Sequence, residues 1–195
     1  MKLKISLLLL ISFYLLFIGC EDKKNSINSN IKNKPIQQTK QNSQQSNSNY
    51  LITLNTSDNK KIQIKRVDNK TIFKDYENKI ILLNFFATWC RPCKVEIPHL
   101  NALRKVYIKD FEIISVLLEK NKSQEFINSF IKHFKVTYPV TNGPENIQLA
   151  KSIGGIKSIP TMFMYDKNGN QIEKFKGIVS PEILEKYIKN NIKKK

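Results

Sequence analysis

The chain has 195 residues, with 33 Lys and Arg against 16 Asp and Glu, and a formal net charge of +17 at pH 7. This length allows one domain with a substantial hydrophobic core and some additional segments. The basic residues are scattered and form no stripe with interleaved aromatic side chains, so we expect no nucleic-acid partner. Attraction to an anionic membrane surface is the expected consequence of the charge.

The N-terminus has the pattern of an export signal. Two lysines in the first four residues precede an apolar run over residues 5–18, which Gly19 and Cys20 follow. This run suits a signal peptide and is short for a membrane-spanning helix, which needs about 20 apolar residues. A small residue before a cysteine at this place resembles the bacterial lipobox, although Phe17 stands where that motif prefers leucine.

The lipobox resemblance implies a signal peptide over residues 1–19 and a lipid anchor on Cys20 in the cell membrane. The alternative is a plain signal peptide or anchor with an incidental cysteine. Both interpretations place residues 21–195 on the periplasmic or extracytoplasmic side, in an oxidising compartment.

The segment over residues 20–49 is rich in Asn, Ser, Gln and Lys. It cannot bury enough apolar surface to offset the entropy cost of ordering, so we predict a flexible tether. A strand-like alternation then begins and indicates a folded domain over residues 50–195. Its first element is a β-hairpin, with strands around Ile52 and Ile64 and a polar turn over residues 57–60.

The rest of the domain alternates strands and helices. Residues 80–86 are nearly all apolar, as in a central strand covered on both faces. The next helix reaches about residue 107, with Pro98 inside it as a kink and with Leu100, Leu103 and Val106 among its buried residues. The later elements are strands over 111–118, 161–165 and 171–175, helices over 123–134, before Gly154 and over 181–192, and a short extended piece over 136–140. This order predicts an α/β domain.

The tetrapeptide from Cys90 to Cys93 is the strongest chemical signal in the sequence. Two cysteines separated by two residues can close a small disulfide. If a helix begins near Cys90, its unpaired N–H groups favour thiolate over thiol, and the cation Arg91 acts in the same direction. A thiol with a lowered pKa at a solvent-facing tip is a nucleophile for disulfide exchange.

This motif, with Trp89 before it and the element order around it, resembles the thioredoxin superfamily. The strand–helix junction over residues 83–90 is similar to the membrane-tethered TlpA/ResA branch. Pro98 lies where thioredoxins kink their active-site helix, and residues 158–161 resemble the loop that carries a cis-proline facing the two cysteines. The resemblance covers about residues 50–192 and implies a thioredoxin-like fold, a central mixed β-sheet flanked by helices, with an extra N-terminal β-hairpin.

The resemblance also implies roles for single residues. Cys90 would be the more exposed thiol that attacks a substrate disulfide, and Cys93, more buried, would resolve the mixed disulfide. Pro160 would be cis and leave the backbone of Ile159 to pair with a substrate strand, with an ordinary trans proline as the alternative. Trp89 would pack beside the site and shape access to it, unless it is a plain core residue.

Two positions stand out against cytosolic thioredoxins. Asn84 replaces their buried aspartate, and because an amide cannot titrate, another group must help to deprotonate Cys93. Glu96 lies three residues after Cys93 on the same helical face, and ResA-like proteins carry a glutamate at this spacing. The alternative is a solvated charge paired on the helix, but the positions three and four residues away hold no Lys or Arg.

Two structural explanations compete for the cysteine pair. A disulfide that closes so short a loop stabilises little, which favours redox work over a structural cross-link. A zinc site needs four ligands, and the only other soft candidates are His99, His133 and Cys20. We therefore expect no metal and no other cofactor.

The predicted function is that of an extracytoplasmic, membrane-tethered thiol-disulfide oxidoreductase. TlpA/ResA-like and cytochrome c maturation proteins are reductants, which implies disulfide-containing exported proteins as clients, including apocytochrome c, and a membrane thiol-relay protein as the source of electrons. A dithiol oxidase or isomerase is an alternative, although the stretch between Leu118 and Thr161 is short for the inserted domain of strong oxidants. A second alternative is a non-catalytic lipoprotein that uses the fold for docking.

Overall fold

The computed structural model describes residues 49–193. The predicted signal peptide, the predicted lipidation site Cys20 and the predicted tether up to residue 48 lie outside this range. No helix within residues 49–193 is long and apolar enough to cross a membrane.

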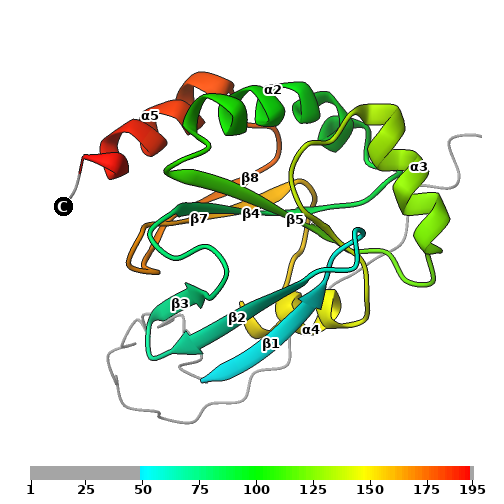
Figure 1. The fold of residues 1–195 in the computed structure, drawn as a ribbon, viewed down its shortest axis with the longest axis horizontal. Helices are drawn as coiled ribbons and strands as arrows, with labels where there is room; N and C mark the ends of the chain where they lie inside the picture. The colour runs from blue at the N-terminus through cyan, green and yellow to red at the C-terminus, as the bar shows by residue number, and fades with distance from the viewer. Residues whose placement is uncertain (1–48, 194–195) are drawn as a thin grey trace, which may run out of the picture. The chain divides into compact units, whose positions relative to one another are not determined.

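Two β-sheets organise the domain (Figure 1). The smaller sheet is antiparallel and contains β1 (Tyr50–Asn55), β2 (Lys61–Val67) and β3 (Lys70–Phe73) in that order. The larger sheet has the order β6-β5-β4-β7-β8 and is mixed, because β4 runs parallel to β5 and antiparallel to β7. Its strands are β4 (Ile80–Phe86), β5 (Phe111–Leu117), β6 (Val140–Thr141), β7 (Thr161–Tyr165) and β8 (Gln171–Lys176). The predicted central mixed sheet is confirmed.

Helices cover the larger sheet on both faces (Figure 1). Helix α2 (Arg91–Tyr107) and helix α5 (Pro181–Ile192) lie over one face, and α3 (Gln124–Phe134) covers the end of that face that adjoins the start of α2. Helix α4 (Glu145–Ser152) and the smaller sheet lie against the opposite face. The strands β4, β5 and β7 are therefore buried on both faces.

Successive side chains of β4 point to opposite faces of the larger sheet and pack into two separate hydrophobic clusters. All seven residues of β4 are buried, as its apolar sequence predicts. Ile80 and Leu82 pack with residues of α2 and α5, whereas Ile81 and Leu83 pack with the smaller sheet and α4. Phe86, at the end of the strand, belongs to a third cluster that contains both cysteines.

Three details differ from the sequence prediction. The N-terminal hairpin carries a third strand, β3, which follows a turn in which Asp68 has a φ of 54°. The extended piece expected over residues 136–140 is a strand only at Val140–Thr141. Val106 is exposed, while Leu100 and Leu103 are buried. At about 100° per residue, Val106 points about 120° away from Leu100 around the helix axis.

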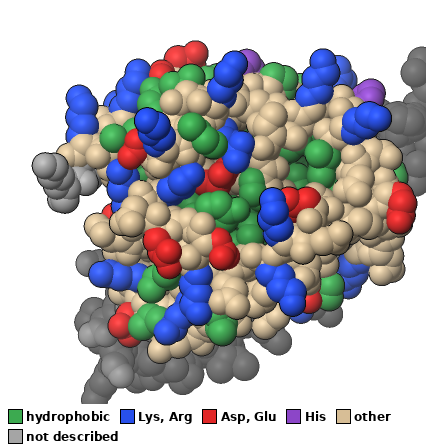
Figure 2. Space-filling model, in the orientation of Figure 1, with side chains coloured by type: hydrophobic (Ala, Val, Ile, Leu, Met, Phe, Trp, Pro, Cys, Tyr) green, Lys and Arg blue, Asp and Glu red, His purple; other side chains and the backbone are tan. Residues whose placement is uncertain are grey.

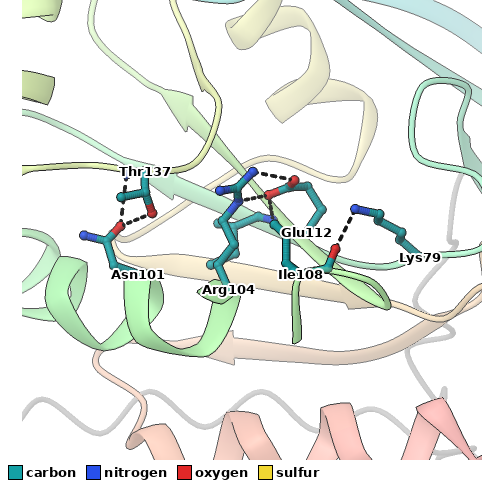
Figure 3. Close-up of polar contacts among 7 residues, drawn as sticks. Lys79, Asn101, Arg104, Ile108, Glu112 and Thr137 are labelled. Carbon is teal, nitrogen blue, oxygen red and sulfur yellow. Dashed lines mark hydrogen bonds and ion pairs between the residues drawn. The ribbon is translucent and has the colours of Figure 1, made fainter. Parts of the chain in front are cut away.

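Polar contacts attach α2 to its surroundings (Figure 3). Arg104 donates from Nε to Glu112 Oε1 over 2.5 Å and from its second terminal nitrogen to Oε2 over 3.0 Å. Asn101 Oδ1 accepts hydrogen bonds from the backbone N–H and the hydroxyl of Thr137 at 3.0 and 2.8 Å. These contacts fix the helix that begins at the cysteine motif.

Charged side chains are dispersed over the surface shown in Figure 2. Lys and Arg side chains lie among Asp and Glu side chains on this face and do not gather into one stripe. The exposed pairs include Lys60 with Asp58 at 2.8 Å and Lys189 with Glu185 at 3.1 Å.

Candidate active site

Cys90 and Cys93 form a disulfide at the N-terminus of α2. The two sulfur atoms are 2.04 Å apart, and the Cα atoms are 5.3 Å apart. Cys90 is the N-cap residue in an extended conformation, and its sulfur accepts a hydrogen bond from the Cys93 N–H at 3.3 Å. Pro92 lies in the first turn, where a missing N–H costs nothing. The first sulfur thus lies where the helix N–H groups stabilise negative charge, as the sequence predicts.

The relative exposure of the two cysteines corrects one prediction. Cys90 is 3% and Cys93 5% exposed, so Cys90 is not the more exposed residue in the disulfide form. Both pack in one cluster with Phe86, Phe130 and other apolar side chains of β4, β5 and α3. The bond between the sulfurs holds both side chains against this cluster.

The loop before β7 adjoins the same cluster. The peptide bond between Ile159 and Pro160 is cis, as predicted. Ile159 is half-buried and packs against the cluster that contains the cysteines. The carbonyl of Pro160 accepts a hydrogen bond from the N–H of Gly177 at 2.8 Å, which ties the loop to the end of β8.

Large apolar side chains are exposed in the segments that form the site. Trp89 is 69% exposed, which excludes a plain core role and leaves its ring at the surface, directly before Cys90. Ile178 is also exposed and lies next to Gly177, which contacts the cis-proline.

Glu96 lies inside the protein on the same helix as the cysteines. It is 3% exposed, and its Oε1 accepts a hydrogen bond from the Val179 N–H at 2.9 Å. Its Oε2 is buried without a hydrogen-bond partner among the described residues. Burial raises the pKa of Glu96 to about 7, although the bond from Val179 partly opposes the shift. The alternative of a solvated helix charge is therefore wrong, and the carboxyl can exchange a proton near neutral pH.

Asn84 is buried in the strand that precedes the cysteine motif. Its Nδ2 donates a hydrogen bond to Ser115 Oγ at 3.1 Å, and its Oδ1 has no partner among residues 49–193. Ser115 is the residue opposite Asn84 in the register of β4 and β5. Asn84 and Cys93 line the same small cavity, so an amide that cannot titrate stands close to the second cysteine.

Glu119 is a residue of this region that the sequence interpretation missed. It accepts hydrogen bonds from the backbone N–H of Thr88 and, at 2.6 Å, from the Thr88 hydroxyl, and it pairs with Lys122 Nζ at 3.1 Å. Burial opposes its ionisation, but the bonds from Thr88 and Lys122 outweigh this and lower the pKa of Glu119. One signal could have identified it: β5 runs parallel to β4, and residues just beyond the ends of adjacent parallel strands meet at one sheet edge.

No group of three or more His, Cys, Asp and Glu side chains within residues 49–193 is placed to hold a metal ion.

Comparison with known proteins gives consistent matches. A profile of the AhpC/TSA family matches residues 55–173. The chain is 34% identical over 122 residues to "Thiol-disulfide oxidoreductase ResA" of Bacillus thuringiensis subsp. konkukian (strain 97-27), across 62% of this chain and 68% of that protein. The ResA of Geobacillus kaustophilus (strain HTA426) is 31% identical over 118 residues, across 60% and 65% of the two chains.

Solved structures agree with these matches. A thioredoxin-family thiol:disulfide interchange protein from Chlorobium tepidum TLS aligns with a TM-score of 0.56 and 28% identity, over 73% of this chain and 93% of that one. StoA from Bacillus subtilis has the same fold, with a TM-score of 0.56 and 22% identity over 73% and 98% of the two chains. The chain thus belongs to the AhpC/TSA family, as a thioredoxin-like thiol-disulfide oxidoreductase related to ResA.

Proposed function

We propose that this oxidoreductase reduces disulfides of exported proteins, apocytochrome c among them, while a lipid on Cys20 holds it at the extracytoplasmic face of the cell membrane. The observation that carries the proposal is the Cys90–Cys93 disulfide at a helix N-terminus, packed beside the cis-proline loop. A membrane thiol-relay protein returns the pair to the dithiol.

The reaction proceeds in two exchanges. The Cys90 thiolate attacks one sulfur of a client disulfide, the bond between the client sulfurs breaks, and the second client sulfur leaves as a thiolate that takes a proton from water. The Cys93 thiol then loses its proton, and its sulfur attacks Cys90. The Cys90–Cys93 bond forms, the bond from Cys90 to the client breaks, and the client leaves with both sulfurs reduced.

Glu96 accepts the proton of Cys93 in the second exchange. Its support is threefold: it lies one helical turn after Cys93, it is buried, and its pKa of about 7 suits proton transfer at neutral pH. Arg91, next to Cys90, favours the thiolate of the first exchange.

Clients dock on the exposed edge of the site. The backbone of Ile159 pairs with an extended client segment, and the exposed side chains of Trp89 and Ile178 supply apolar contact. The support for this surface is the exposure of both side chains and the packing of Ile159 against the cysteine cluster.

Reduction of insulin disulfides by the full chain, with dithiothreitol as the electron source, tests the enzymatic part. We expect turnover that the variants Cys90→Ser and Cys93→Ser both lose. Turnover equal to that of dithiothreitol alone would instead favour the non-catalytic docking protein.

Client identity and anchoring need separate experiments. Cys93→Ser stops the reaction after the first exchange, so mixed disulfides on Cys90 accumulate and can be identified. If the trapped proteins include no c-type cytochromes and none of their maturation factors, the apocytochrome part of the proposal is ruled out.

The substitution Cys20→Ser tests the lipid anchor. It should move the protein from the membrane to the soluble fraction, and retention in the membrane would indicate a plain N-terminal anchor.

A further inference from the structure

A small cavity lies against Cys93 in the interior of the domain. Its volume is about 10 Å³, and apolar side chains, Val140 among them, form most of its wall. The polar groups on the wall are Asn84, Ser115 and Tyr138. This is about the least accessible volume in which a cavity can hold one water molecule, which also needs two or more polar partners to be retained.

One of these polar groups lacks a partner inside the protein. Asn84 is 5% exposed, and because its Nδ2 donates to Ser115 Oγ, the atom without a partner among the described residues is the carbonyl Oδ1. A buried carbonyl of this kind is normally paired with protein or with ordered water. Burial also raises the pKa of Tyr138, so its hydroxyl stays neutral beside Ser115 and can donate or accept a hydrogen bond.

Asn84 and Ser115 are polar residues in two otherwise largely apolar strands, and both line the cavity. Asn84 is the one polar residue of β4, and the polar residue opposite it in the register with β5 is Ser115. Both strands are buried along their whole length, so an apolar pair would fit this position at lower desolvation cost. The polar pair occurs where the wall of the cavity also contains Cys93.

We propose that one water molecule occupies this cavity, donates one hydrogen bond to Asn84 Oδ1 and, once the disulfide is reduced, donates the other to the sulfur of Cys93. Asn84 is then a positioning residue, because it holds the water that stabilises the Cys93 thiolate. The inference rests on the proposed function, since this thiolate matters in the second exchange. In that step the thiolate electron pair forms the bond to Cys90, the bond from Cys90 to the client breaks, and the water stays neutral.

Two variants remove the water by different routes. Asn84→Leu removes the acceptor, and Val140→Ile fills the cavity while the polar residues stay unchanged. Val116→Ile is the matched control, because it adds the same methylene in the core on the other face of the sheet and does not line the cavity.

The reaction of the reduced full chain with an aromatic disulfide, dithiobis-nitrobenzoate, separates the two exchanges. The first thionitrobenzoate ion reports the attack of Cys90 and the second reports the attack of Cys93. We expect Asn84→Leu and Val140→Ile to slow the second release by about 10- to 100-fold, the range for a lost hydrogen bond to a charged group, with the first release unchanged. Val116→Ile should leave both releases unchanged.

The outcomes separate the two proposals. A second release that stays within twofold of the parent in Val140→Ile would overturn the water site and leave the proposed function intact. If Asn84→Leu slows both releases equally and lowers the melting temperature, Asn84 has a structural role, and this result too would overturn the water site. Absence of the first release from the parent would contradict the proposed function itself. If Asn84→Leu does not fold, Val140→Ile and its control decide alone.

Discussion

The backbone N–H of Val179 donates a hydrogen bond to Oε1 of Glu96 over 2.9 Å and joins two residues that are 83 positions apart. Val179 lies between β8 and α5, so the bond ties the active-site helix to the C-terminal part of the domain. Among the described residues this is the only hydrogen bond of the buried Glu96 carboxyl, because Oε2 has no partner there. The bond holds Glu96 in place and partly offsets the effect of burial, which is what raises the pKa of this carboxyl.

Stability should depend on pH through Glu96. Its pKa is about 7 in the folded protein against an ordinary pKa of 4.5 for a solvated glutamate. Below pH 4.5 both states are protonated. Between pH 4.5 and about 7 the unfolded state has lost this proton while the folded state still binds it, so stability falls as pH rises and levels off above about pH 7, where both states are ionised.

Glu96→Gln keeps an acceptor for Val179 and cannot ionise. We expect the variant to be more stable than the parent at pH 8 by on the order of 2 kcal/mol, and equally stable near pH 4. Urea unfolding at both pH values measures this difference. A difference that is the same at both pH values would mean that ionisation of Glu96 is not its cause.

The same substitution should slow the second exchange. Loss of a positioned proton acceptor typically costs about 100-fold or more, so release of the client from Cys90 should become rate-limiting in Glu96→Gln. The pH–rate profile of the parent should show an inflection near the pKa of about 7, and the variant should lack it. An inflection that persists in Glu96→Gln would assign the titration to another group.

Glu119 should stabilise the loop that leads into Cys90. Glu119→Ala leaves the buried N–H and hydroxyl of Thr88 without their acceptor, and we expect a loss of about 2 kcal/mol in the free energy of unfolding. Lys122→Met is the control, because it removes the partly exposed ion pair and the contact of Lys122 Nζ with the Phe126 ring but keeps the acceptor of Thr88, and it should cost less than about 1 kcal/mol. Equal effects of the two substitutions would contradict a role for Glu119 at Thr88.

The pair formed by Arg104 and Glu112 should stabilise the packing of α2 on β5. The Glu112 side chain is 4% exposed and that of Arg104 24%, so Glu112→Gln leaves a partly buried guanidinium with a neutral partner and should cost about 2 kcal/mol. The double variant with Arg104→Met should recover part of this loss, because no unpaired charge remains. Thermal or urea unfolding of the three proteins checks both statements, and a double variant less stable than Glu112→Gln would contradict them.

The sequence predicted those parts of the fold that depend on local pattern. The apolar run of β4 and the alternation of apolar and polar residues in β1 and β2 indicate strands. The residues of the turn that ends in Gly169 indicate a hairpin. Strand β3 was missed because four residues after a tight turn carry too short a pattern to distinguish from a loop. Val106 was misplaced because an apolar residue does not reveal which helix face it occupies.

At the site, residue types were predictable and their surroundings were not. Cys90, Cys93 and Glu96 stand close together in the sequence, so spacing alone placed them on one helix. The burial of Cys90 depends on cluster residues from β5 and α3, and the role of Glu119 depends on the meeting of two strand ends. Such contacts join segments that are distant in the sequence, and no local pattern specifies them.

The reduction potential of the Cys90/Cys93 pair tests the assignment as a reductase most directly. The full chain is equilibrated with thiol–disulfide buffers of known potential, and the dithiol fraction is determined by alkylation. A reductase of exported disulfides should have a value near that of thioredoxin, about −270 mV. A value near that of the oxidant DsbA, about −120 mV, would contradict the assignment and favour a dithiol oxidase.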